Sequence, residues 1–180
     1  MSILKVARMG HPVLRAKARA LDRADFRNGG VQKLIDDLID TMIEYHGVGL
    51  AAPQVHEGLR LFVAMLDANE TGDSKSEPVV VINPEITPVG NDIVDGWEGC
   101  LSVDGLRGRV IRPSMVRVRG LDRHGQPVDL EATGLYAVCI QHEMDHLIGK
   151  VFLDRMTDLS TLSQLDEFER FWKEEHATVI

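Results

Sequence analysis

The sequence predicts an α+β fold in a single domain over residues 1–180, with mostly antiparallel sheets around a buried metal-binding helix. Three patterns support this fold. Short apolar segments bounded by turn residues are typical of strands. Helical periodicity in the N-terminal half and near the C-terminus predicts two further helices, the first of them amphipathic. A mostly apolar segment leads into a pair of histidines, which indicates the buried helix.

Composition places the chain among ordinary globular domains. Its 180 residues are 44% hydrophobic with a mean hydropathy of −0.09, which is enough to build a core. The net charge of −8 and the pI near 5.3 argue against a large nucleic-acid interface, so we predict no DNA partner. The apolar runs are short and no signal peptide is visible, which predicts a cytoplasmic protein without a membrane segment.

The first helix is predicted from residue 31 onward. Apolar side chains recur there at the i, i+3, i+4, i+7 spacing of an amphipathic helix and stop near Gly47. The side chains expected to face the core are Leu34, Ile35, Leu38, Ile39, Met42 and Ile43. Before this helix, Pro12 biases His11 toward an extended or turning connection. Histidines without a ligand partner at a recognisable spacing are interpreted as structural or surface residues: His11, His46, His56, His124 and His176.

Several segments after this helix have the composition of strands. Residues 61–66 and 79–83 are separated by a polar loop at 69–77, and Pro84 is expected to end the second strand. Further predicted elements are strands at 92–96, 108–111, 115–121 and 128–132 and a hairpin turn at 123–126. No repeat or linker divides the chain, so these strands are expected to wrap around the buried helix.

The C-terminal part is expected to hold two helices. Residues 134–140 are apolar on most sides, which predicts the buried helix, and Gly149 ends it. A short strand is predicted at 151–153, and a last helix from about 159 to 175. The inward-facing side chains of this helix would be Leu162, Leu165, Phe168 and Trp172.

The strongest chemical signal is the segment Gln141-His142-Glu143-Met144-Asp145-His146-Leu147. Positions four apart lie on one helix face, about 6 Å apart along the axis, so His142 and His146 can bind one ion. A divalent metal lowers the pKa of a bound water to about 7, and Glu143 can take and return that proton. Such a catalytic site usually has a third protein ligand and an open position for water.

A cysteine is the natural third ligand, and the chain has two. Cys100 has three interpretations: a buried apolar thiol, a nucleophile or a metal ligand. Beside a histidine pair we favour the ligand, because one Cys and two His form a known open catalytic set. Cys139 shares the helix face, but a bridged ion would lie about 7 Å from it along the axis, too far for a metal–sulfur bond of about 2.3 Å.

Residues 47–54 form a loop of small residues, Gly-Val-Gly-Leu-Ala-Ala-Pro-Gln. The simpler interpretation is a helix C-cap followed by a tight turn. The functional interpretation is that backbone groups can approach a ligand closely while Gln54 supplies an amide donor. The loop lacks a Gly-Lys-Ser/Thr end and a preceding strand, so it is not a phosphate-binding loop.

Three segments together resemble the motifs of bacterial-type peptide deformylase. They are residues 47–54, 98–102 and 141–146, in the family's order and at similar separations. A single His-Glu-x-x-His match has a high false-positive rate, but three ordered motifs do not arise by coincidence. The resemblance implies hydrolysis of the N-formyl-methionyl end of a nascent chain, which releases formate and a free amine.

The resemblance also implies the metal centre. Cys100, His142 and His146 would hold one divalent ion with a water in the fourth position, and Glu143 would act as general base and general acid. Family members typically use Fe²⁺, and Zn²⁺, Ni²⁺ or Co²⁺ can occupy the site. The ligand set alone does not select among these ions.

Substrate contacts follow from the same resemblance. Gln54 and the backbone N–H of Leu101 would donate to the oxyanion that develops during attack, each such donor being worth about 3 kcal/mol of barrier. Gly49 would admit the peptide backbone, and apolar neighbours would form a methionine pocket. The residues assigned to substrate binding are Gly47, Val48, Gly49, Glu98, Gly99, Val138 and Cys139.

Two features depart from the family pattern. Asp104 stands where the family often has proline, which changes the loop after the second motif. Some relatives end in a basic helix that docks on the ribosome, but residues 166–175 are mostly acidic here. A transient ribosome contact is therefore left open, and stable docking through this tail is not expected.

Two alternatives remain at this point. A zinc peptidase could use the same histidine pair, but the third histidine of a metzincin would fall at Phe152, and the acidic residues Glu167, Glu169 and Glu175 lie in no recognisable motif. A non-catalytic domain could use the ion as a structural staple. Structural sites usually have four protein ligands, and only three are nominated here.

Overall fold

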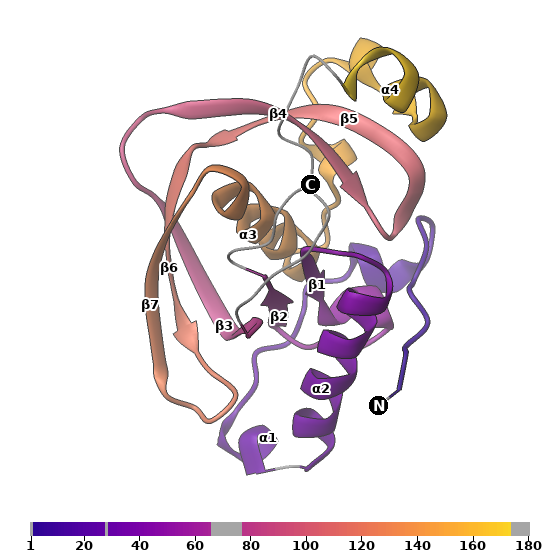
Figure 1. Ribbon diagram of the computed structural model, residues 1–180. Coiled ribbons are helices and arrows are strands. Elements are labelled where there is room, and N and C mark those ends of the chain that lie inside the picture. Colours follow the sequence, from indigo (N-terminus) through magenta and orange to yellow (C-terminus); the bar gives the residue numbers. More distant parts are fainter. Residues whose placement is uncertain (1, 28, 66–76, 174–180) are drawn as a thin grey trace.

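Two sheets enclose a central helix in the computed structural model, which describes residues 2–27, 29–65 and 77–173 (Figure 1). The five-stranded sheet has the order β1-β2-β3-β6-β7 and comprises β1 (Gly49–Ala51), β2 (Leu61–Ala64), β3 (Val79–Pro88), β6 (Met115–Leu121) and β7 (Pro127–Thr133). The three-stranded sheet has the order β4-β5-β8 and comprises β4 (Ile93–Cys100), β5 (Val103–Pro113) and β8 (Ser163–Gln164). Neighbouring strands are antiparallel, so the predicted α+β fold is confirmed.

The described helices are α1 (Arg23–Arg27), α2 (Gly29–Glu44), α3 (Gly134–Leu147) and α4 (Leu165–Phe171). Helix α2 is the predicted amphipathic helix, and it packs its apolar face on β1 and β2. Its buried apolar side chains are Val31, Ile35, Leu38 and Met42. The prediction was wrong for Ile43, which is 50% exposed because it lies at the edge of the apolar stripe.

Helix α3 lies between the two sheets (Figure 1). Its buried side chains include Ala137, Val138, Ile140 and Leu147, so the predicted buried helix is confirmed. The buried face also carries charged and polar groups, which a core accepts only with partners. No helix in 2–27, 29–65 or 77–173 is long and apolar enough to cross a membrane.

The strand that was expected to end at Pro84 is longer than predicted. Strand β3 continues to Pro88 through an irregularity between Ile82 and Glu85, and Asn83 adopts a positive φ of 53° there. A bulge tolerates proline because its N–H is not needed for the ladder. Residues 47–54 include β1, which was not predicted, and most of a 3₁₀ turn, Ala52–Val55, where the simpler interpretation expected a tight turn.

Two C-terminal predictions were wrong. Residues 151–153 are not a strand: Phe152–Asp154 is a 3₁₀ turn, in which the Asp154 carboxylate accepts a hydrogen bond from the Val151 N–H at 2.8 Å. The last helix begins only at Leu165, after a second 3₁₀ turn and β8. Among its expected inward residues, Phe168 is buried but Leu162 and Trp172 are 38% and 43% exposed.

Some predicted features lie outside the described residues. These are positions 69–76 of the polar loop, residue 66 of the second strand, positions 174 and 175 of the last helix, and His176.

Gly149 closes the turn after α3 and provides a test of the fold. It has a φ of 76°, and an added Cβ would lie 2.6 Å from the backbone oxygen of Arg15. Gly134 also has a positive φ, 57°, but nothing lies within 4 Å of its added Cβ. We expect Gly149→Ala to lower the free energy of unfolding by about 3 kcal/mol and Gly134→Ala by about 1 kcal/mol. Urea unfolding measures both, and equal losses would contradict the packing described here.

Candidate metal centre and active site

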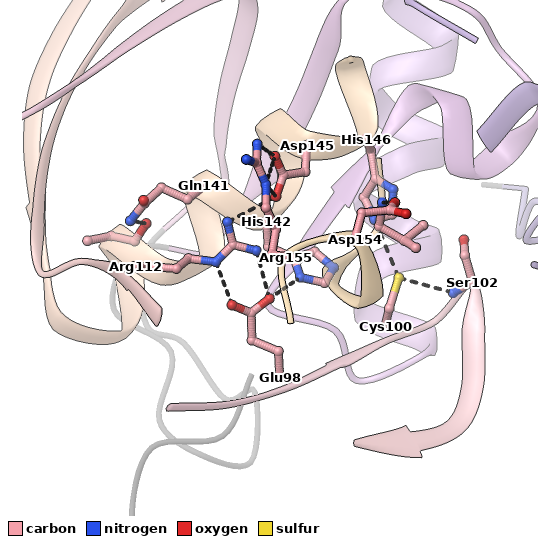
Figure 2. A network of polar contacts seen from close by, with 12 residues as sticks. Glu98, Cys100, Ser102, Arg112, Gln141, His142, Asp145, His146, Asp154 and Arg155 are labelled. Carbon is pink, nitrogen blue, oxygen red and sulfur yellow. Dashed lines mark hydrogen bonds and ion pairs between the residues drawn. The ribbon is translucent and has the colours of Figure 1, made fainter. Parts of the chain in front are cut away.

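The fold brings the end of β4 against α3, so the three predicted ligands lie together. Cys100 lies at the end of β4, and His142 and His146 lie one turn apart on the helix (Figure 2). Their ligand atoms all lie within 4.8 Å of one another. The Cys100 Sγ atom is 3.4 Å from His146 Nε2. This cluster is able to hold a metal ion, because one thiolate and two imidazoles at this separation match an open three-ligand site.

The electrostatic environment of Cys100 fits that role. Burial opposes ionisation of the thiol, but the neighbouring His146 and His142 rings outweigh it and lower the Cys100 pKa well below its ordinary value. The Ser102 N–H also points at the sulfur, at 3.4 Å. Metals are bound by the thiolate form, so the site favours the species that an ion requires.

Cys139 has the opposite environment. Burial, together with the nearby Glu143 and Glu98 carboxylates, raises its pKa well above the ordinary value. Its thiol faces the backbone oxygen of Val48 at 3.5 Å. Cys139 is thus a neutral core thiol beside the centre and not a member of the ligand cluster.

Glu143 projects from α3 next to the first histidine and is 4% exposed. Its Oε2 atom has no hydrogen-bond partner among the residues that the structure describes. Burial raises its pKa to about 7, although the two histidines act in the other direction. A buried carboxyl without a protein partner is costly, and one that titrates near neutrality is suited to accept and release a proton.

Position 49 must be a glycine because β1 passes too close to side chains of α3 for a larger residue to fit. An added Cβ would lie 2.6 Å from Oε1 of Glu143 and 2.9 Å from the Cys139 sulfur. The absence of a side chain therefore allows β1 to pass close to α3 beside Glu143. The small residue at this position has a structural cause that the sequence pattern did not distinguish from a functional one.

Gln54 faces the centre from the 3₁₀ turn after β1. Its Oε1 accepts a hydrogen bond from the Ala51 N–H at 2.8 Å, which directs the Nε2 donor toward Cys100 Sγ at 3.6 Å and Ser102 Oγ at 3.5 Å. Leu101, half-buried in the turn between β4 and β5, lies between these two residues in sequence. The Gln54 amide therefore lies near the Cys100 sulfur, and Leu101 directly follows Cys100 in the turn.

Glu98 was predicted to contact substrate, and its position does not support that prediction. It is fully buried, and its Oε2 accepts hydrogen bonds from His142 Nδ1 at 2.8 Å and from Arg112 Nη2 at 2.9 Å (Figure 2). Burial opposes its ionisation, but Arg112 and His142 lower its pKa to about 2. A permanent carboxylate at Nδ1 fixes the tautomer in which Nε2 of His142 is free to bind a metal.

The network behind Glu98 was missed by sequence reasoning. Arg112 donates to Asp145 at 3.0 Å as well as to Glu98, and Arg155 also donates to Asp145 at 3.0 Å. The one available signal was Arg112 itself, which takes an inward position of a strand next to buried Val110. Its partners come from distant parts of the chain, so no local pattern reveals them.

The remaining predicted substrate residues differ in burial. Val48, just before β1, is half-buried, and Val138, on α3 itself, is 3% exposed. Gly47 lies near the Leu101 side chain, 3.4 Å from where its own Cβ would be. Gly99 lies under the Arg107 guanidinium, since an added Cβ would meet Nη1 at 2.0 Å. Arg107, another residue missed by the sequence analysis, has a buried Nε without a partner in the described part of the chain.

Known proteins are similar to this chain in sequence and in fold. The family model for polypeptide deformylase matches residues 3–161. A peptide deformylase of Stutzerimonas stutzeri is 45% identical over 159 residues, 88% of this chain and 90% of the relative. One of Pseudomonas aeruginosa is 46% identical, with the same 88% and 90% covered. The crystal structure of a peptide deformylase from Legionella pneumophila matches with a TM-score of 0.78 at 39% identity, covering 94% of this chain and 96% of that one. Since the family model covers residues 3–161, most of the chain, and the relatives are 45–46% identical over 88% of it, the chain belongs to the polypeptide deformylase family.

Proposed function

We propose that Cys100, His142 and His146 hold one divalent metal ion at the centre of a formyl-peptide hydrolase site. As a family member the chain is an enzyme that removes the N-terminal formyl group from nascent peptides. The observation that carries the ligand assignment is the convergence of these three side chains within 4.8 Å. On the family resemblance, we propose Fe²⁺ as the ion in the cell, with Zn²⁺, Ni²⁺ and Co²⁺ as substitutes.

Glu143 is proposed to carry the proton in this reaction. A bound ion would polarise the formyl carbonyl and make a coordinated water more acidic. Glu143 would accept the proton of the attacking water and deliver it to the amine nitrogen that leaves. Its pKa of about 7 supports both steps, because neither protonation state is strongly favoured near neutral pH.

Two donors are proposed to stabilise the oxyanion. The Gln54 amide is aimed at the centre by its bond to the Ala51 N–H, and the Leu101 N–H lies in the turn beside Cys100. Donors that are already oriented need no reorganisation when negative charge develops on the formyl oxygen. The bond from the Ala51 N–H holds the Gln54 amide in place before substrate arrives.

The substrate is proposed to enter along β1. The half-buried Val48 offers apolar surface, and the buried Val138 adds apolar packing on α3, which suits a methionine side chain. We propose nascent N-formyl-methionyl peptides as the partner and the cytoplasm, where such chains are made, as the location. Formate release from formyl-Met-Ala-Ser, with no cleavage of blocked internal peptides, is expected.

The third ligand is tested by the two cysteines. Cys100→Ser should lower metal content per chain at least tenfold, since even residues behind the ligands commonly change affinity by about 10–100-fold. Cys139→Ser is the matched control and should retain one ion per chain, because its thiol is neutral and outside the cluster. Metal analysis after anaerobic purification decides, and the reverse result would overturn the assignment.

The proton carrier is tested by Glu143→Ala. We expect metal content to stay unchanged while formate release falls by about 10²–10⁴-fold, the usual contribution of a general acid–base group. Glu85→Ala, on a strand and exposed, is the control for removing a carboxylate elsewhere. Undiminished formate release by Glu143→Ala would refute the role proposed for this residue.

A further inference from the structure

Residues 7–9 connect two parts of the active site that belong to different sheets. The Ala7 N–H donates to the backbone oxygen of Gln54 at 2.7 Å, and the Met9 N–H donates to that of Ser102 at 2.7 Å. Gln54 follows β1 of the five-stranded sheet, and Ser102 lies in the turn between β4 and β5 of the three-stranded sheet. One short segment therefore binds the main chain on both sides of the boundary between the two sheets, at Gln54 and at Ser102.

Of the two residues held in this way, Gln54 carries one proposed oxyanion donor, and Ser102 is next to Leu101, which carries the other. Ser102 follows Leu101 directly, and its N–H points at the Cys100 sulfur at 3.4 Å. The Gln54 amide reaches the same sulfur at 3.6 Å, an ordinary length for a contact to sulfur, and the Ser102 hydroxyl at 3.5 Å, which is long for a hydrogen bond to oxygen. The two backbone bonds from residues 7 and 9 are shorter, at 2.7 Å each, and they join main chain to main chain.

Arg8, the residue between Ala7 and Met9, makes a third contact through its side chain. Arg8 Nη1 lies 2.7 Å from Asp104 Oδ2, an exposed ion pair between the N-terminal segment and β5. Asp104 is the residue that replaces the proline common in the family pattern. The pair gives that replacement a partner, since it anchors the middle of the segment to the same strand that follows Ser102.

We propose that residues 7–9 are a positioning segment that sets the distance between the Gln54 amide and the Leu101 N–H. This role rests on the proposed function of those two donors. None of residues 7–9 is among the residues assigned to the metal or to the substrate. Its effect would be on the transition state, because the oxyanion forms only there and a small displacement of a donor weakens an interaction that substrate binding does not use.

Met9→Pro tests this proposal because the local turn tolerates proline. The His11 N–H donates to Arg8 O at 3.0 Å and Gly10 has a φ of 100°, which is the pattern of a type II turn with Met9 at its second position. Proline is favoured at that position, so the change removes the N–H while preserving the turn. Met9→Ala, which keeps the N–H, is the matched control for loss of the side chain.

We expect kcat per bound metal to fall about tenfold in Met9→Pro relative to Met9→Ala, with KM for formyl-Met-Ala-Ser unchanged. This loss is smaller than the ~10²–10³-fold effect of deleting a donor outright. Equal kcat per bound metal in the two variants, or a rise in KM alone, would overturn the proposal. An unaltered protein with full metal content that releases no formate would instead refute the proposed function itself.

The ion pair provides a second test that does not depend on Met9→Pro folding. Arg8→Gln and Asp104→Asn alter exposed side chains, and each should lower kcat about twofold, in keeping with an exposed pair. The double variant should lose no more than either single variant, because both remove the same contact. Unchanged kcat in both single variants, together with unaltered or unfolded Met9→Pro, would overturn the proposal.

Discussion

Burial of α3 is the constraint on which the rest of this structure depends. The helix carries His142, Glu143, Asp145 and His146, each at most 4% exposed. Charged groups are stable in such a place only when partners and hydrogen bonds replace water. Arg112 on β5 supplies the partner of Asp145 on the helix and also binds Glu98 on β4, and Glu98 in turn accepts a hydrogen bond from His142. The ion network thereby ties the three-stranded sheet to the helix.

Two glutamates in this site show how the same side chain acquires opposite properties. Glu98 shares its oxygens between Arg112 and His142, and its pKa falls to about 2. Glu143 has an unpartnered oxygen, and burial raises its pKa to about 7. The first is a fixed acceptor that orients the His142 ring, a proposed ligand, and the second has an oxygen free to take up a proton. Arg112 therefore makes the distinction, because it reaches only one of them.

The features that could be predicted from the sequence are those that depend on residues close together in the chain. The period of α2 and the spacing of His142 and His146 follow from helix geometry, so both could be predicted. Arg112 and its carboxylates could not, because their pairing depends on the register of β4 against β5. The helix predicted from residue 159 was interrupted because Asp158 caps a 3₁₀ turn through the Ser160 N–H, a local bond that competes with helical periodicity.

The choice between the two cysteines shows where sequence geometry and structure meet. Distance along the helix already argued against Cys139, but it said nothing about whether Cys100 would reach the histidines. In the fold, Cys100 lies beside two imidazoles that favour its thiolate, and Cys139 lies beside a carboxylate that disfavours one. A metal needs the thiolate, so the charges around each sulfur select the same residue that distance selected. Two independent physical arguments thus agree on one ligand.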